Sequence, residues 1–169
     1  MAFETSEYKT SFLPVSTADT EILILGTLPG DRSLQLGEYF GHPRNRFWKI
    51  IAGITGSPVP ESYTQKLDLL HTHRIGLWNV LHSATRKGSL DGAIRNEQPN
   101  DLPAFIASHE KLKVIGFDGL KPEAYYNRYF SRNKDLSYLS LPSCSPANAR
   151  YSLERLCSEW EILLTTDKA

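Results

Sequence analysis

Short apolar runs alternate along this chain with segments of helical period. The clearest run, Ile22 to Leu25, leads directly into a Gly/Pro turn that begins at Gly26. Runs of this length, bounded by turn residues or by helical patterns, are typical of buried strands. The sequence therefore predicts four strands, at residues 21–25, 75–81, 112–117 and 136–141.

The segments between and after these runs carry apolar residues at helical spacing. The last stripe is the clearest, because Leu153, Leu156, Trp160 and Leu163 fall on one face behind Ser152, a good capping residue. Four earlier helices are also expected. They are one from Phe47 that ends at Gly56, one after Pro60 to about His73, one capped by Asn100, and one over 123–130.

Strands that alternate with helices indicate an α/β fold, with a parallel sheet covered by helices on both faces. Residues 82–99 are too polar and aperiodic for a long element, so we expect a surface loop there, with a short helix over 89–94 capped by Ser89. At 169 residues the chain is long enough for one full core and too short for two ordinary domains. Residues 1–169 are therefore expected to form a single domain.

All strand-to-helix loops of a parallel sheet emerge at one edge, where such sheets collect their ligands. The loops at 26–45, 79–87, 118–121 and 143–151 should therefore face a common cleft. The first of them joins a tight Gly/Pro turn to aromatic, amide and cationic side chains. We expect this cleft to be the active site.

The amino-acid composition says less than these loops do about which class of partner the protein binds. The 19 basic and 19 acidic residues give a formal charge of zero, so overall charge does not favour a nucleic-acid partner. Only local charge would favour such a partner, at two clusters, and only if the fold brings these clusters together. Arg32, Arg44, Arg46 and Lys49 surround the first loop, and Arg150 and Arg155 lie near the last.

The metal-ligating residues show no spacing that is typical of a metal site. Cys144 and Cys157 cannot form a four-thiolate site, and the five histidines form no zinc motif. No metal and no cofactor are expected. The segment from Met1 to Ser11 lacks the apolar core of a leader peptide, and no run approaches membrane-spanning length. We expect a cytoplasmic protein, or a nuclear one in a eukaryote, with no membrane partner.

Several common site motifs are absent. The first strand is followed by neither a Gly-x-Gly-x-x-Gly fingerprint nor a P-loop, which disfavours ordinary nucleotide binding. A Gly-x-Ser-x-Gly elbow is also missing. Ser33 and Ser145 remain as nucleophiles for a small-molecule hydrolase, which is the weakest alternative.

Four ordered blocks carry a resemblance to a known family. They are 26–34 with 39–48, then 76–81, 86–91 and 141–148. In this order they resemble the uracil-DNA glycosylase superfamily, and most of all its hypoxanthine-DNA (deoxyinosine) glycosylase branch. The blocks extend over nearly the whole chain, and four motifs in order are far more specific than one.

The resemblance implies a three-layer α/β/α sandwich around a four-stranded parallel sheet. It also implies a monofunctional, cofactor-free enzyme that extrudes a nucleotide from DNA and hydrolyses the bond between sugar and base. The implied partner is DNA that contains deaminated bases, with hypoxanthine ahead of uracil. A monomer with no obligatory protein partner is expected.

Three side chains receive roles from the resemblance. Phe40 matches the aromatic that stacks on the flipped base in mismatch-specific relatives. Asn45 is expected to position the attacking water or bind the base, and its competing interpretation is a helix N-cap. Asn79 lies where uracil enzymes use a base-reading Asn; the hypoxanthine branch more often has Asp there.

The first loop departs from the pattern of many superfamily members at Leu28, where they carry Asp or Asn. The hypoxanthine branch tolerates an apolar residue at this place. Backbone N–H groups from Thr27 through Gly30 to Asp31 are expected to stabilise the departing base. Asp118 is expected either to contact the base or to make the turn after the third strand.

The last loop is expected to bind the phosphates that flank the lesion. Its predicted contacts are Ser143, Ser145 and the N–H groups around Ala147, with Asn148 or Arg150 entering the vacated space, and Arg44, Arg46, Arg86 and Lys87 adding phosphate attraction. Two alternatives stay open beside the deoxyinosine glycosylase. One is a mismatch-specific uracil or thymine glycosylase, and the other is a non-catalytic reader of damaged DNA.

Overall fold

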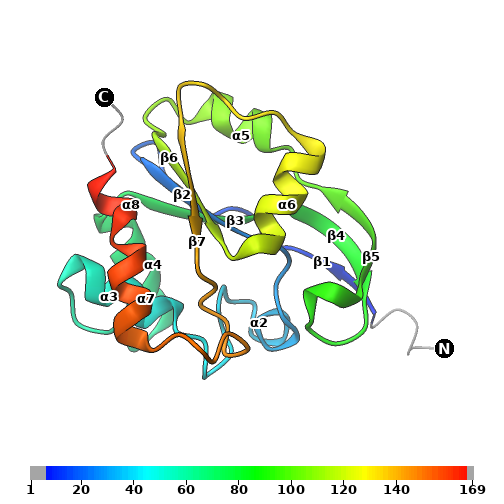
Figure 1. The fold of residues 1–169 in the computed structure, drawn as a ribbon, viewed down its shortest axis with the longest axis horizontal. Coiled ribbons are helices and arrows are strands. Elements are labelled where there is room, and N and C mark those ends of the chain that lie inside the picture. The colour runs from blue at the N-terminus through cyan, green and yellow to red at the C-terminus, as the bar shows by residue number, and fades with distance from the viewer. Residues whose placement is uncertain (1–6, 167–169) are drawn as a thin grey trace.

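The computed structural model describes residues 7–166, and at its centre lies a four-stranded parallel sheet. Residues 1–6 lie outside the described part, and the expectation that the N-terminal segment is no leader peptide falls partly on them. The sheet has the order β3-β2-β6-β7 (Figure 1). Its strands are β2 (Ile22–Gly26), β3 (Ile75–Asn79), β6 (Val114–Asp118) and β7 (Ser137–Leu141). All four predicted strands are present.

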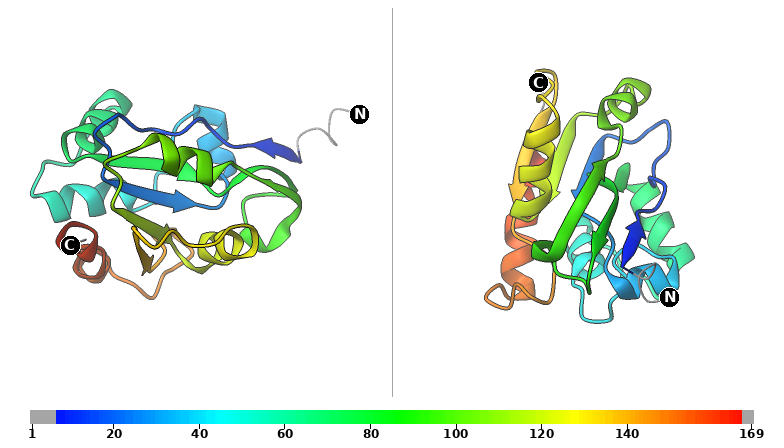
Figure 2. Two further views of the ribbon diagram at one scale, coloured as in Figure 1. Left: turned by 90° about the horizontal axis from the view of Figure 1, so that it is seen from above. Right: turned by 90° about the vertical axis from the view of Figure 1, so that its right-hand side faces the viewer.

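Helices cover both faces of this sheet, as the two views of Figure 2 show. One face carries α3 (Phe47–Thr55), α4 (Tyr63–Thr72), α7 (Leu153–Trp160) and α8 (Ile162–Thr165). The other face carries α5 (Leu102–Ser108) and α6 (Leu120–Tyr129). The alternation along β2 explains the two layers, because Ile22 and Ile24 enter one core cluster and Leu23 and Leu25 the other. The three-layer α/β/α prediction is confirmed.

The helix ends follow the chemistry of single residues. Ser152 caps α7 as predicted, with its hydroxyl accepting a hydrogen bond from the Arg155 N–H at 3.1 Å. Gly56 ends α3 in the left-handed region, with φ of 67°. The last apolar stripe is divided at Glu161 into α7 and α8, where a single helix was predicted.

The prediction of a loop over 82–99 was wrong. This segment forms an antiparallel hairpin of β4 (Leu81–Arg86) and β5 (Ile94–Pro99), and β1 (Tyr8–Thr10) joins it in the order β1-β4-β5. Apart from Leu81, the buried residues of β4 are small or polar, namely Ser83, Ala84 and Arg86. Because these side chains lack the apolar alternation of an ordinary strand, the pattern did not reveal it.

Three further differences lie near the sheet's carboxyl edge. The run predicted as one strand over 75–81 divides at Asn79, where the Val80 N–H turns to donate to the Gly26 carbonyl at 2.8 Å. The first loop contains a helix, α2 (Asp31–Leu36), that was not predicted. Residues 91–93 form a 3₁₀ turn, η1 (Asp91–Ala93), that begins after Leu90 and not after Ser89.

Asn100 is not the cap of α5. Asp101 takes that place, and its carboxylate accepts from the Ala104 N–H at 3.0 Å. The Asn100 amide instead donates to the carbonyls of Asn79 at 2.9 Å and Leu81 at 3.1 Å. It therefore fixes the bend between β3 and β4. Within residues 7–166, none of the helices has the length and apolar character required to cross a bilayer.

Candidate active site

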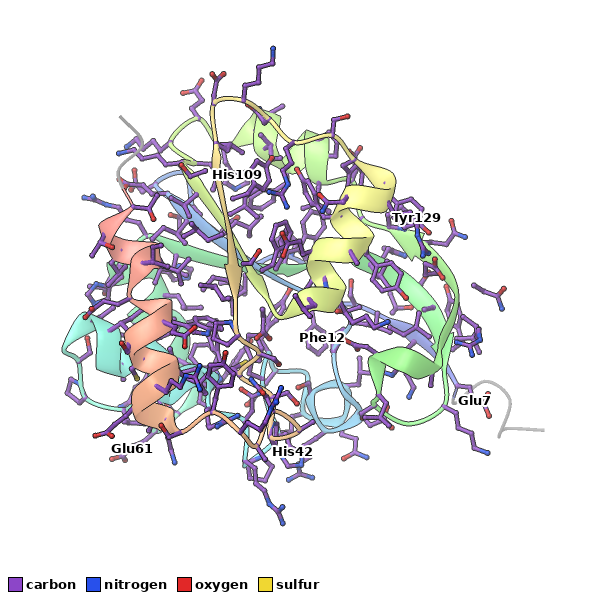
Figure 3. The ribbon with its side chains drawn as sticks, in the orientation of Figure 1. Glu7, Phe12, His42, Glu61, His109 and Tyr129 are labelled. Carbon is purple, nitrogen blue, oxygen red and sulfur yellow. The ribbon has the colours of Figure 1, made fainter. Side chains whose placement is uncertain are left out.

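A cavity of about 1220 Å³ opens where the carboxyl ends of the parallel strands meet. It is bounded by the loops after β2, β3, β6 and β7, as the topology predicts. His42 marks this end of the molecule in Figure 3 and lines the cavity. The structure brings nearly all the predicted site residues to this cavity: Thr27, Leu28, Gly30, Asp31, Phe40, Asn45, Asn79, Asp118, Ser143, Ser145, Ala147, Asn148 and Arg150. Arg44 is exposed and lies outside its lining.

The loop after β2 presents its backbone to the cavity. Among the residues that the structure describes, the N–H groups of Thr27, Leu28 and Gly30 donate to no protein acceptor, and Pro29 has no N–H. The Asp31 N–H, which was predicted to serve with them, instead donates to the Ser89 hydroxyl at 2.9 Å. Leu28 itself is buried in the core, with 7% of its surface exposed. The loop thus offers three free donors beside an apolar side chain, and no carboxylate at position 28.

Asn79 is the side chain that most directly indicates a ligand. It ends β3 and is 6% exposed, yet its amide nitrogen Nδ2 has no hydrogen-bond partner in the described part of the chain. Two arginine nitrogens share this condition, but neither arginine lines the cavity. Leaving a buried polar group unpaired costs about 1–3 kcal/mol. A ligand in the cavity would supply the missing partner.

Gly26 makes room for the Asn79 side chain. A Cβ atom added at Gly26 would lie 2.9 Å from Asn79 Oδ1. The two residues are paired across β2 and β3, so any larger side chain at position 26 would displace the amide. Gly26 therefore both begins the turn after β2 and leaves the space that a side chain of β3 occupies.

Phe40 forms an aromatic wall. Its ring stacks on Phe47, with centroids 4.1 Å apart and planes 15° from parallel, and it meets Trp48 edge-on at 6.4 Å. The residue is half-buried and lines the cavity. Its φ of 53° lies in the left-handed region, which is uncommon and costly for a residue with a side chain. The fold holds Phe40 in this conformation at a place where a planar ligand would bind.

Asn45 lies in the cavity but is not the N-cap of α3, because Arg46 takes that place and Asn45 makes a turn just before it. Its Oδ1 accepts a hydrogen bond from the Phe47 N–H at 2.8 Å, at the start of α3. The same residue lines the cavity. The Asn45 oxygen is thus engaged by the Phe47 N–H, and the same side chain acts on the Cys144 thiol, whose pKa it lowers against the effect of burial.

Asp118 turns the chain after β6 and also holds the last loop. Its Oδ1 accepts from the Cys144 N–H at 2.9 Å, and its Oδ2 accepts from the Cys144 thiol at 3.3 Å. Burial raises the pKa of the Asp118 carboxyl to about 6, against the lowering effect of these two hydrogen bonds. Burial likewise raises the pKa of the Cys144 thiol, helped by the negative charge of Asp118.

Arg46 holds the last loop, residues 142–151, in place through hydrogen bonds. The Arg46 guanidinium donates to the carbonyls of Tyr151, of Ser145 at 2.8 Å and of Asn148 at 3.0 Å. This arginine therefore shapes the loop, while its attraction of phosphates stays a prediction. A guanidinium suits the task because it presents five donors in a fixed plane.

The residues of this loop that were predicted to contact phosphates differ in which of their hydrogen-bonding groups remain unpaired. The Ala147 N–H already donates to Ser145 Oγ at 3.1 Å, and the Asn148 amide donates to the Ser143 carbonyl at 2.9 Å. The Ser143 hydroxyl accepts from the Ser145 N–H at 3.1 Å. Neither serine hydroxyl donates a hydrogen bond to an acceptor in the described chain. Both hydroxyl protons therefore remain available to a ligand.

The Arg86 side chain was expected to attract phosphates and is instead 1% exposed. It donates from Nε to the Gly88 carbonyl and from Nη2 to the Pro29 carbonyl, both at 2.6 Å. Asp31 joins this group through an ion pair of 2.5 Å with the buried Lys9 and lies 3.6 Å from Arg86. We call Lys9, Asp31 and Arg86 the clamp, because they tie β1 and the hairpin to the first loop.

Comparison with known proteins agrees with this geometry. The model of the Uracil DNA glycosylase superfamily matches residues 13–164. The chain belongs to this superfamily. A protein named Hypoxanthine DNA glycosylase from Methanosarcina acetivorans is 39% identical over 92% of this chain and 97% of its own length. Another of that name, from Methanosarcina barkeri, is 38% identical over 69% of this chain and 75% of its own.

A solved structure extends the likeness to three dimensions. It is a solution NMR structure from Methanosarcina acetivorans, provisionally named a uracil DNA glycosylase. It superposes with a TM-score of 0.80 at 39% identity, covering 91% of this chain and 94% of the other. The resemblance read from the four sequence blocks is confirmed.

One residue that lines the cavity received no role from the sequence, although it ends the block 86–91 that carries the resemblance. Asp91 lines the cavity at the start of η1. Burial raises the pKa of its carboxyl, while the Thr27 side chain and the charges of Arg86 and Lys121 act in the opposite direction. Asp91 stood in a segment taken for a loop, so only the fold of the hairpin shows that it reaches the site. No group of three or more metal-ligating side chains occurs within residues 7–166.

The raised pKa of Asp118 leads to a stability prediction. Between about pH 4 and 6 the folded state holds a proton that the unfolded state has released, so folding loses stability as the pH rises through this window. Asp118→Asn removes this loss. Relative to wild type, we expect the variant to gain up to about 3 kcal/mol of unfolding free energy between pH 4 and pH 8.

Chemical denaturation across this pH range measures the effect. Asp68→Asn, at an exposed carboxylate of α4, is the control for removing a surface charge. A difference between wild type and Asp118→Asn that does not change with pH would show that the Asp118 carboxyl stays hydrated in the folded protein.

Proposed function

We propose that this protein is a DNA glycosylase that hydrolyses the N-glycosidic bond of a deaminated nucleotide flipped out of DNA, with hypoxanthine as its preferred base. The named relatives support the choice of base, since one of them matches nearly the full length of both chains. The observation that carries the proposal is the unpartnered Asn79 amide, buried at the wall of a cavity that is large enough for a nucleobase.

Asn79 suits the Watson–Crick edge of hypoxanthine. The amide nitrogen would donate to O6 of the base, and the amide oxygen would accept from its N1–H. Phe40 would stack on the ring plane, a contact worth roughly 1–3 kcal/mol per base. The edge contact supplies selectivity and the stacking contact supplies affinity.

The departing base carries away negative charge and leaves positive charge on the sugar. The free N–H groups of Thr27, Leu28 and Gly30 are placed to stabilise the negative charge. Because position 28 has no carboxylate, the attacking water needs another partner. We assign it to the Asn45 amide, whose orientation is held by its bond to the Phe47 N–H.

Two features of the environment belong to the same proposal. DNA is the partner, gripped through the Ser143 and Ser145 hydroxyls and through Arg150 at the cavity rim. The enzyme is taken to act as a cytoplasmic monomer. Salt dependence tests the grip, because binding that relies on phosphates weakens steeply as salt is added.

An excision panel tests the function. Labelled duplexes that contain hypoxanthine, uracil, xanthine or a thymine mispair are incubated with the protein, and abasic sites are then cleaved with alkali. We expect strand cleavage at deoxyinosine above all the others. Robust cleavage at deoxyuridine without cleavage at deoxyinosine would assign the uracil-specific alternative, and tight lesion binding without base release would assign a non-catalytic reader.

Replacing Phe40 with alanine is expected to lower deoxyinosine excision about 10- to 100-fold, because one base–aromatic stack is lost. Alanine at φ 53° keeps the backbone strain of the original residue, so the change isolates the ring. Single-turnover excision measures the effect. Phe130→Ala, at a half-buried aromatic in the other core cluster, should excise at nearly the wild-type rate once folded. Equal rates for Phe40→Ala and wild type would exclude stacking on Phe40.

A further inference from the structure

The backbone of Phe40 is strained, and no hydrogen bond of its own holds it. Its φ of 53° lies in the left-handed region, where a residue with a Cβ atom is uncommon. Such a conformation persists only where the surrounding structure over-determines it. Among the residues that the structure describes, the N–H and carbonyl groups of Phe40 form no hydrogen bond. The restraint therefore comes from the residues on either side.

The two peptide planes that meet at Phe40 are each held by a side chain from another segment. The plane before it is fixed at the Tyr39 carbonyl, which accepts from the Trp48 Nε1–H at 3.3 Å. The plane after it is fixed at the Gly41 N–H, which donates to Ser33 Oγ at 2.9 Å. The φ and ψ angles of a residue are the rotations that relate its two peptide planes, so bonds to both planes restrain the residue between them.

A tyrosine outside the cavity adds a third restraint. The Tyr63 hydroxyl accepts from the Tyr39 N–H at 3.1 Å, one peptide plane earlier. Tyr63 is the first residue of α4, whose start is fixed by a capping box of Ser62 and Gln65. Because Tyr63 does not line the cavity, it can act on a bound base only through the turn that contains Phe40.

The Phe40 ring has one face left for a ligand. The other face is covered by Phe47, which is fully buried and lies nearly parallel to it. The direction of the Cα–Cβ bond changes with φ, so a Phe40 that left the left-handed region would turn its ring out of this stack. A ring that is already oriented has no ordering cost when a base arrives.

We propose that Ser33 and Tyr63 are positioning residues, whose hydroxyl groups hold the Phe40 ring in the orientation that stacks on the flipped base. This proposal rests on the proposed glycosylase function and names the groups that prepare one wall of its cavity. Neither hydroxyl has to touch DNA in this role. It also gives a use to the Ser33 hydroxyl other than that of a nucleophile, since this buried oxygen is engaged by the Gly41 N–H.

Removing either hydroxyl group tests this role. For Ser33→Ala and Tyr63→Phe we expect the maximal single-turnover rate of deoxyinosine excision to fall about three- to tenfold, because each variant loses one neutral hydrogen bond. The enzyme concentration that gives half of this rate should stay within about twofold of wild type, since phosphate contacts hold the duplex whether or not the base is stacked. Tyr138→Phe is the matched control and should excise at the wild-type rate. Tyr138 is also half-buried, its hydroxyl accepts from the Asn133 N–H at 2.9 Å, and it lies away from the cavity.

Combination with Phe40→Ala separates positioning from a structural effect. Once the ring is absent its orientation no longer matters, so adding Ser33→Ala or Tyr63→Phe to Phe40→Ala should change excision less than about twofold. A loss of the same size in both backgrounds would overturn the proposal, because the hydroxyl groups would then act on folding or on DNA directly. Wild-type rates in both single variants would overturn it as well.

Fluorine NMR reports the orientation of the ring without any substrate. With para-fluorophenylalanine at position 40, the parent protein should give one sharp resonance, and Ser33→Ala or Tyr63→Phe should shift or split it. An identical resonance in the parent and in both variants would contradict the proposal. If wild type excises no base at all, the glycosylase function fails, and this resonance still decides whether the two hydroxyl groups hold the ring.

Discussion

Replacing Asn79 with alanine is expected to slow deoxyinosine excision about 10²–10³-fold with little change in thermal unfolding. The loss in rate follows from removing both hydrogen bonds to the base, including the donor that offsets negative charge as the base leaves. The small effect on folding follows from the environment of the amide. Its Nδ2 bonds to nothing in the described chain, so truncation breaks no interaction through that atom.

Single-turnover excision and calorimetry together check this result. Asn127→Ala, at an exposed amide on α6, is the control and should match wild type in both. Asn79→Asp separates the two hydrogen bonds, because an ionised carboxylate still accepts from N1–H and no longer donates to O6. Wild-type turnover in Asn79→Ala would remove Asn79 from base recognition.

Replacing Asn45 with alanine is expected to slow excision about 10²-fold and to lower the unfolding free energy by about 1 kcal/mol. The first effect comes from losing the amide that positions water, and the second from losing the hydrogen bond that the Phe47 N–H donates. These two consequences arise from different atoms of one side chain. A second variant can therefore separate them.

Asn45→Ser is that variant. A serine hydroxyl can also accept from the N–H two residues on, though more weakly than an asparagine oxygen, so part of the lost stability should return while excision stays as slow as in Asn45→Ala. Thermal unfolding and single-turnover rates measure the two properties. Recovery of excision together with stability in Asn45→Ser would mean that Asn45 acts on catalysis only through the start of α3.

The parallel sheet could be predicted from the sequence because its two central strands, β2 and β6, are buried on both faces. The run from Ile22 to Leu25 is almost wholly buried, and its unbroken apolar pattern predicts a strand. The hairpin of β4 and β5 could not be found this way. Its buried residues include Ser83 and Arg86, and the burial of the arginine is offset by hydrogen bonds to the Gly88 and Pro29 carbonyls. Such partners come from tertiary structure.

The candidate site was predicted more fully than its supports. Topology alone brings the loops containing Phe40, Asn79 and Asp118 to one edge, and the cavity is found there. The roles of Arg46 and Asp91 depend on contacts across distant segments, so no local pattern discloses them. Two neighbouring arginines in one motif, Arg44 and Arg46, illustrate this difference, because one is exposed and the other fastens a loop about a hundred positions away.

The adjacency of Asn45 and Arg46 has a consequence for redesign of specificity. Asn45 is the residue to which we assign the attacking water, and Arg46 carries the loop that we propose holds the DNA backbone. Substitutions at Asn45 or Arg46 would therefore change turnover and DNA binding together, even where only one of the two was meant to change. Asn79 and Gly26 belong to a different pair of strands, so retargeting the enzyme to another base is best begun on their wall.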